Sequence, residues 1–435
     1  MTPPPAACLL GHLPLVSPAS CYPDRLARIY PFQPYRYSAR AGRIENLVTQ
    51  PYDKISPAMQ TRYLALSPYN LVRITLGERF PTDSDKDNVY TRAAEKLNAW
   101  ISDGILERES APSLYAYYQR FKVPDTGRTL ERKGFIGLGG LEEYSAGVVF
   151  RHEQTLSGPK KDRMELLRQT RAQFELLFLL YSDPALTIDK LLDASGSGAS
   201  AVEITDEYEA VHRFWRISDP AAIRAIQESM ADKKLLIADG HHRYETALAF
   251  RSDNPSLADA AAVPMTFVNM NSPGLEILAT HRVVRGLNGF DALKFAAQIQ
   301  ARKLGSLDEL RRVFQVPAAA NIRIAIASRS GEIYLYERHR KPGELDVTVL
   351  HQQLLGSLLG ISDEAVREER NIEYVRGLDA AYLKVREGAD AAFLLEPTTI
   401  AQVADVAFSG GVMPQKSTDF YPKLLSGLTI YKFER

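Results

Sequence analysis

The segment spanning residues 233–251 constrains the fold more than any other part of the chain. Its apolar run at 235–238 is typical of a buried strand, Asp239-Gly240 predicts a turn, and Ala and Leu then recur with helical spacing. The first N–H groups of a helix have no partner within it, and with the helix dipole they favour an anion. Gly240 allows a positive φ and a close approach to a ligand. This junction therefore predicts a binding site for a phosphate group.

The polar side chains of this junction have a structural interpretation as well. Asp239 is suited to cap the helix, His241 and His242 to stand at the surface, and Arg243 to pair with a carboxylate. The junction alone leaves both interpretations open, so the rest of the chain has to decide between them.

Composition narrows the classes of protein. The chain has 435 residues, which favours two or three domains, and its 45% hydrophobic and 24% charged residues are typical of a globular protein. A formal net charge of +0 argues against a broad surface for nucleic acid. The only cysteines, Cys8 and Cys21, lie near the N-terminus, which excludes a disulfide framework and a catalytic cysteine in the folded body.

We expect residues 1–24 to form a disordered extension, because they are rich in Pro and lack the basic start of a secretory signal. No apolar run has the length needed to cross a bilayer. These observations predict a cytoplasmic protein that acts on a small molecule and has no membrane partner; the oligomeric state stays open.

The order of elements predicts an α/β to α+β fold with mixed sheets and flanking helices. We expect an N-terminal α/β body over residues 25–287 and a smaller C-terminal α+β domain over residues 288–435. Among the elements, the patterns predict a helix at 57–66 capped by Ser56, a strand at 71–76, paired strands at 113–121 and 132–141, and a hairpin of strands 322–326 and 333–337.

A second concentration of polar residues occupies the loop at 151–163. His152 and Glu153 are suited to proton transfer, whereas Lys160 and Arg163 are suited to neutralise phosphate oxygens. A charged surface loop followed by a well-capped helix is the alternative. Loops with this many different polar groups between two core elements are common places for functional sites.

A third concentration lies near the C-terminus at 413–423. Lys416, Ser417 and Thr418 are suited to bind an anion, but two prolines and two aromatics fit a rigid surface clamp equally well. Three further candidates stand elsewhere: Asp53 on a turn at 51–56, and His281 and Arg282 at the end of an apolar run. A solvated turn and a strand edge are their structural alternatives.

These motifs together resemble a bacterial and archaeal family known as domain of unknown function 1015, from about residue 31 to the C-terminus. The name carries no established activity. The likeness rests on Pro51-Tyr52-Asp53, Asn70-Leu71-Val72-Arg73, His152-Glu153, Gly158-Pro159-Lys160, Asp162-Arg163, Ala238-Asp239-Gly240-His241-His242-Arg243-Tyr244, Thr280-His281-Arg282 and Met413-Pro414-Gln415-Lys416-Ser417-Thr418. Through it Arg73 and Tyr244 join His281 and Arg282 as candidates for the cleft.

The Gly240–Arg243 turn also resembles the phosphate-binding turn of the ParB-like and sulfiredoxin superfamily. That resemblance implies a nucleotide-binding core of this kind, ATP or ADP as ligand, and an activity such as that of the free-serine kinases. Sulfiredoxins have a cysteine where this chain has His241, so thiol repair is excluded. The step from the turn to the fold is an analogy.

The leading hypothesis is a nucleotide-dependent phosphotransferase, with L-serine the first acceptor to test. Gly240, His242 and Arg243 would hold the phosphates, and a divalent ion such as Mg²⁺ would bridge them to one carboxylate. Charge would also come from His152, Lys160, Arg163 and Lys416, with Ser417 and Thr418 beside them. The candidates for proton transfer are Asp53, Glu153, Asp239 and His241.

Two other classes remain possible from the sequence. A nucleotide-binding regulatory protein without rapid turnover would use the same turn. A metal-dependent hydrolase would use His241 or His242 with Glu245 on one helix face, although Arg243 in that set would repel a cation. Neither alternative is separated from the kinase hypothesis by the residues alone.

Overall fold

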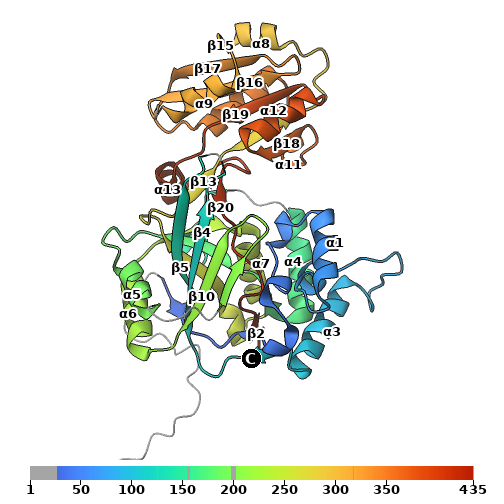
Figure 1. Cartoon of the computed structure of the whole chain (residues 1–435), viewed down its shortest axis with the longest axis vertical. Coiled ribbons are helices and arrows are strands. Elements are labelled where there is room, and N and C mark those ends of the chain that lie inside the picture. Colours follow the sequence, from blue (N-terminus) through green and yellow to red (C-terminus); the bar gives the residue numbers. More distant parts are fainter. Residues whose placement is uncertain (1–26, 125, 154–156, 197–201, 317, 435) are drawn as a thin grey trace, which may run out of the picture.

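The computed structural model describes residues 27–124, 126–153, 157–196, 202–316 and 318–434. The expected extension over residues 1–24 lies outside them. Two large sheets, one in each half of Figure 1, organise the described chain. Both are flanked by helices, which confirms the α+β fold class with mixed sheets.

The larger sheet has nine strands and contains the junction at Asp239 near one edge. β1 (Ile29–Tyr30) pairs with β5 outside the main path. The others follow the order β6 (Val149–Phe150), β11 (Leu235–Asp239), β8 (Leu177–Tyr181), β12 (Ala262–Asn269), β5 (Thr129–Gly140), β4 (Leu114–Lys122), β10 (Val211–Ile217) and β9 (Val202–Thr205).

Both faces of this sheet are covered, which explains why β8 is apolar throughout. Leu177 and Leu179 pack with α5 (Thr187–Ser195) and α6 (Pro220–Met230), whereas Phe178 and Leu180 belong to a second cluster on the opposite face. A strand buried on both faces has no polar alternation. The apolar sequence of this strand therefore predicts burial on both faces but does not predict which helices cover each face.

A group of helices stands beside the sheet, most of it on the right of Figure 1. It comprises α1 (Pro57–Leu66), α2 (Val72–Thr75), α3 (Val89–Ser102), α4 (Ser157–Thr170) and α7 (His241–Asp253). Ser56 caps α1 through the Met59 amide, as its sequence predicts. The small pairs β2 (Tyr35–Tyr37) with β3 (Leu106–Arg108) and β7 (Ala172–Gln173) with β21 (Tyr431–Lys432) lie in this body.

The strand predicted at 71–76 is wrong, because this segment forms α2. The side chain of Asn70 accepts a hydrogen bond from the Val72 amide at 2.9 Å, which starts a helical turn. Leu71 and Ile74 then pack with Trp100 in one cluster. In so short a segment almost every residue is buried, so its pattern does not distinguish a strand from a helix.

The second sheet has six strands and its own covering helices. One face packs on α9 (Leu307–Gln315) and α12 (Leu378–Arg386), and the other on α8 (Ala292–Gln298), α10 (Asp346–Val349), a π-helical stretch Leu350–Leu358 and α13 (Ile400–Phe408). A short helix, α11 (Asp363–Arg367), precedes the last strand of the sheet. The strand order is β15 (Arg302–Leu304), β17 (Ile333–His339), β16 (Asn321–Ser328), β19 (Ala391–Leu395), β14 (Thr280–Val284) and β18 (Ile372–Arg376).

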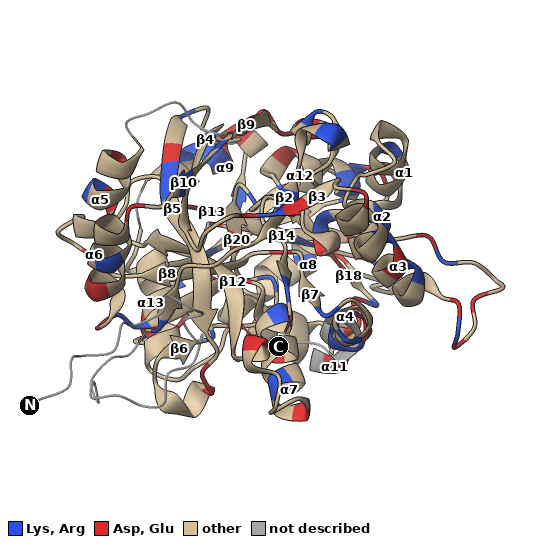
Figure 2. Ribbon diagram, turned by 90° about the horizontal axis from the view of Figure 1, so that it is seen from below, with Lys and Arg blue, Asp and Glu red and all other residues tan. Residues whose placement is uncertain are grey.

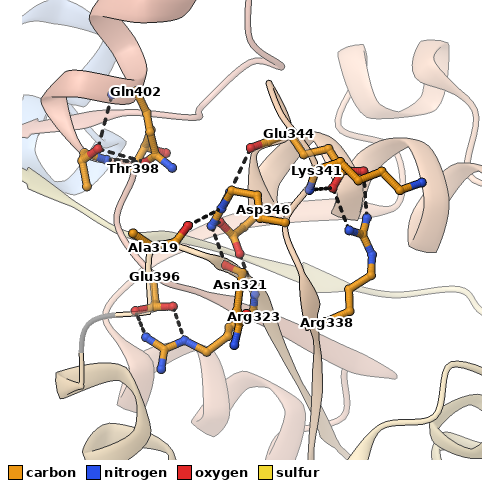
Figure 3. Close-up of polar contacts among 12 residues, drawn as sticks. Ala319, Asn321, Arg323, Arg338, Lys341, Glu344, Asp346, Glu396, Thr398 and Gln402 are labelled. Carbon is orange, nitrogen blue, oxygen red and sulfur yellow. Dashed lines mark hydrogen bonds and ion pairs between the residues drawn. The ribbon is translucent and has the colours of Figure 1, made fainter.

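A polar cluster fastens the second sheet to α9. Arg323 is buried and donates from Nε to Glu396 at 2.7 Å and from its other nitrogens to the Val313 and Val316 carbonyls. Figure 3 shows Glu396 facing Arg323, with Asp346 and Glu344 in the same cluster. One guanidinium thus pairs with a half-buried carboxylate and satisfies carbonyl groups at the end of a helix.

The sheets divide the chain differently from the expected boundary at residue 288. β14 already belongs to the second sheet. Residues 413–434 leave that sheet and return to the larger body, where β20 (Asp419–Tyr421) pairs with β13 (Glu276–Leu278) and β21 with β7. We call residues 413–434 the C-terminal strap. It carries the third polar concentration across the edge of the larger sheet.

Candidate functional site

Two of the three polar loops meet because β6 and β11 are parallel neighbours. Their carboxyl ends lie at the same edge of the sheet, so the loop with His152 and Glu153 lies beside the Asp239-Gly240 turn. His152 confirms this contact: its ring Nδ1 lies 2.8 Å from the Ile237 carbonyl oxygen, and its backbone amide donates to His241 Nε2 at 3.4 Å.

The strand–turn–helix junction has the predicted geometry. β11 ends at Asp239, Gly240 takes a left-handed φ of 103°, and α7 begins at His241. A Cβ at Gly240 would lie 2.7 Å from Leu177 Cδ2, so a side chain is disfavoured by packing as well as by φ. The amides of His241 and His242 start the helix and have no acceptor within it.

The strap brings the third loop to the same place. The Met413 amide donates to the His152 carbonyl at 2.7 Å, and Glu153 Oε1 accepts from the amides of Ser417 at 3.1 Å and Thr418 at 3.4 Å. Lys416 adopts a left-handed φ of 56° in this loop. The three polar loops, whose relative placement the sequence leaves open, therefore meet at one place.

A cleft of about 620 Å³, measured with its space open to solvent, lies where the loops meet. It is lined by Tyr52, Asp53, Lys54, Glu153, Ala238, Asp239, Gly240, His241, His242, Arg243, Lys416, Thr418 and Lys423. The structure thus brings most of the predicted catalytic and phosphate-binding residues to one cavity.

Asp239 is held by two cations. Its Oδ2 lies 2.7 Å from Lys423 Nζ and its Oδ1 lies 3.4 Å from an Arg243 guanidinium nitrogen. Burial by itself would raise the pKa of Asp239, but Lys423 and then Arg243 outweigh it and hold that pKa well below its usual range. Asp239 is therefore ionised and a weak base, suited to positioning rather than to proton transfer.

Asp53 and Lys54 have no such direct partners. They lie on a 3-10 turn, Tyr52–Lys54, and neither side chain makes a hydrogen bond or ion pair within the described part of the chain. The ammonium of Lys423, followed by burial, lowers the pKa of Lys54. Together with Lys416 this lysine places positive charge at the cleft, and no carboxylate in the described part of the chain contacts either ammonium, which favours an anion.

The histidines of the site are neutral at neutral pH. Burial lowers the pKa of both His152 and His241. Burial, followed by the Lys160 ammonium, lowers the pKa of His242, which lines the cleft. His152 does not line the cleft. Its Nε2 lies 2.8 Å from Thr418 Oγ1, so this ring helps to position the strap.

Four other predicted residues stand outside the cleft lining. Lys160 pairs with Glu245, and Arg163 pairs with Asp162 and lies over the Tyr52 ring at 4.1 Å. Ser417 Oγ donates to the Pro414 carbonyl at 2.5 Å, and the buried Tyr244 donates to the Glu142 carbonyl at 2.8 Å. Of these four, Lys160 and Arg163 still place positive charge near residues of the cleft.

The last three candidates hold the structure together. Arg73 donates to the Ser67 and Leu64 carbonyls near the end of α1. His281 is buried and its Nδ1 accepts from the Leu395 amide at 3.2 Å. Arg282 is buried and donates to the Lys416 carbonyl at 3.0 Å, so it positions the strap loop from the second sheet.

Two residues that line the cleft are not among the site residues predicted from the sequence. Lys423 closes the polar segment at 413–423 but was not distinguished from the residues around it, and Tyr52 lies within the Pro51-Tyr52-Asp53 motif. The ligand set of a metal-dependent hydrolase is not assembled: among the described residues no three His, Cys, Asp or Glu side chains are grouped to hold a metal ion.

Charge is distributed without a dominant sign. Figure 2 shows Lys and Arg interspersed with Asp and Glu along the ribbon. Within the described ranges, none of the helices combines the length and the apolar character that crossing a bilayer requires.

The chain belongs to the family described as protein of unknown function DUF1015, whose pattern matches residues 29–380. No curated protein matches it. Among solved structures it is similar to a conserved hypothetical protein from Pyrococcus furiosus, with 14% identity, a TM-score of 0.32, and coverage of 63% of this chain and 87% of the other. A free serine kinase in complex with AMP gives 12% identity, a TM-score of 0.37, and coverage of 66% and 88%. SbnI from Staphylococcus aureus gives 10% identity, a TM-score of 0.35, and coverage of 68% of this chain and 87% of the other.

Proposed function

We propose that this protein is a nucleotide-dependent phosphotransferase that acts on the hydroxyl group of a small metabolite. The observation that carries the proposal is the cleft at the start of α7, where Lys54 and Lys416 line the same cavity as the first residues of the helix and neither ammonium contacts a carboxylate among the described residues. Phosphoryl transfer needs this kind of arrangement, because positioning and charge neutralisation supply most of its rate.

Several residues of the cleft have a role in such a reaction. The amides of the Gly240–His242 turn and the Arg243 side chain hold the phosphates of ATP or ADP, and neutral His242 donates or accepts a hydrogen bond beside them. The acceptor oxygen forms a bond to the terminal phosphorus while the bond from that phosphorus to the bridging oxygen breaks. The shortened nucleotide leaves, and the hydroxyl proton passes to the Asp53 carboxylate.

Asp53 is the acid that the geometry favours for this proton. Asp239 forms ion pairs with Lys423 and Arg243, and Glu153 accepts hydrogen bonds from amides of the strap loop. Asp53 is exposed at the cleft and makes no hydrogen bond within the described residues. A bound Mg²⁺ would neutralise phosphate charge in this cleft.

Phosphorus NMR tests the proposal directly. Purified protein with Mg²⁺ is given ATP or ADP, with and without L-serine, which the resemblance of the Gly240–Arg243 turn makes the first acceptor to try. We expect a new phosphomonoester signal. His242→Ala should weaken nucleotide binding at least tenfold, whereas His339→Ala, which alters an exposed histidine on β17, should leave it unchanged.

The other outcomes separate the alternatives. Nucleotide binding without turnover towards any hydroxyl acceptor would favour a nucleotide-binding regulatory protein. Release of free phosphate alone would indicate that L-serine is not the acceptor. Normal nucleotide affinity in His242→Ala would contradict the assignment of this turn.

A further inference from the structure

A second pocket, of about 1170 Å³ with its space open to solvent, adjoins the cleft. The two cavities share four lining residues, Lys54, Lys416, Thr418 and Lys423, so they meet along these side chains. The other residues of the second pocket are Gln50, Tyr208, Thr280, Glu369, Glu373, Tyr374, Arg376 and Asp419.

This pocket is built from both halves of the molecule. Thr280 lies on β14 and Glu373 and Arg376 lie on β18 of the second sheet, whereas Gln50 and Tyr208 belong to the larger body. Asp419, on the strap, accepts from Arg376 Nε at 2.6 Å and pairs with Lys423 at 3.2 Å. The strap therefore forms the line along which the two cavities and the two halves meet.

The charges that remain after these pairs are arranged in two groups. Lys54 and Lys416 supply positive charge from the larger body and the strap. Glu369, just before β18, and Glu373, on β18, supply negative charge. The only partner of Glu373 among the described residues is Lys384 at 2.5 Å, outside the pocket lining. Most of the lining residues are charged, which disfavours a nucleobase and suits a small polar molecule.

We propose that this second pocket binds the acceptor, and that the acceptor is a dipolar molecule carrying an anionic group and an ammonium group beside its hydroxyl. The inference rests on the proposed phosphotransferase function. The anionic group pairs with Lys54 and Lys416, the ammonium pairs with Glu369 and Glu373, and the hydroxyl reaches the terminal phosphate across the shared lining. Transfer then takes place at the boundary between the two cavities.

Titration calorimetry on the full chain, loaded with ADP or a non-hydrolysable ATP analogue, tests this assignment. The dipolar probes are L-serine, L-homoserine and L-threonine. Glycerate lacks the ammonium and ethanolamine lacks the carboxylate, so each tests one charge. We expect at least one dipolar probe to bind at least tenfold more tightly than both of these, and the absence of binding by all three overturns the proposal.

Matched variants locate the binding. The double variant Glu369→Gln and Glu373→Gln should lower the affinity for the dipolar probe at least tenfold. Its affinity for nucleotide should stay within twofold of the parent protein, because neither residue lines the phosphate cleft. Glu368→Gln removes an adjacent exposed charge outside the pocket and should change neither. Equal affinity of the probe for the double variant and the parent protein overturns the location.

The experiment also separates the two proposals. If no nucleotide binds, the phosphotransferase proposal fails. If nucleotide binds and the dipolar probes do not, only the acceptor assignment fails. Thermal shift measurements check that each variant is folded; we expect little loss of stability, because Glu369 is exposed and Glu373 is only partly buried.

Discussion

Gly240 is the residue on which the geometry of the site depends most directly. It combines a φ of 103° with a Cβ position 2.7 Å from Leu177 Cδ2. We expect Gly240→Ala to lower the free energy of unfolding by about 3 kcal/mol, from backbone strain plus overpacking. Urea denaturation measures this loss.

Gly147 provides the control for that prediction. Its φ is 68°, but a Cβ there meets no atom within 4 Å. Gly147→Ala should therefore cost only the backbone strain, about 1 kcal/mol. Equal losses for the two variants would show that the contact with Leu177 contributes nothing.

Asp53 and Asp239 both have carboxylates in the cleft. We expect the asparagine substitution to lower activity at Asp53 and stability at Asp239. Asp53→Asn should reduce turnover about 100-fold or more, because the proton acceptor is lost, with little change in stability. Asp239→Asn leaves Lys423 and Arg243 without their shared partner and should destabilise the protein by about 3 kcal/mol. Steady-state kinetics and urea denaturation of both variants test this difference, and a stable, active Asp53→Asn variant would contradict the assignment.

At the scale of elements, the contact between the segment after β6 and the strap holds two of the polar loops together. Glu153 Oε1 accepts the Ser417 amide at 3.1 Å and the Thr418 hydroxyl at 3.3 Å. Glu153→Ala leaves these donors without that acceptor and should cost about 2 kcal/mol in unfolding free energy. Glu153→Gln keeps an oxygen acceptor and should lose less, as urea denaturation would measure. A larger loss in the glutamine variant would contradict this account of the contact.

At the scale of the whole molecule, buried neutral histidines make stability depend on pH. Burial, then the Arg282 guanidinium, lowers the pKa of both His281 and His351 to about 3. In the unfolded chain these imidazoles have a pKa of about 6.5, so below that pH the unfolded state binds more protons than the folded state. Stability should therefore be full above pH 6.5 and fall as the pH decreases towards 3.

His351→Gln tests this dependence. The variant removes one of the groups that titrate only on unfolding, so its unfolding free energy should fall less steeply between pH 6 and pH 4, by up to about 1.4 kcal/mol per pH unit. Urea denaturation at several pH values measures both slopes. Identical slopes for the variant and the parent protein would show that His351 does not contribute.

Local patterns predicted much of the fold. The helix at 57–66 has the predicted bounds, and β4, β5, β16 and β17 lie where the strands at 113–121, 132–141, 322–326 and 333–337 were expected. The turn at Asp239-Gly240 followed by a helix is likewise present. These features depend on interactions between residues close in sequence, which a single sequence displays.

The composition of the site was decided by the tertiary structure. The sequence identified three polar segments, but that they share one cleft follows from the parallel pairing of β6 with β11 and from the return of the strap. Lys423 reaches Asp239, 184 positions away, and its ammonium decides that Asp239 is a partner in an ion pair and a poor base. Such contacts arise only when distant segments pack, because no local preference of either residue specifies its partner.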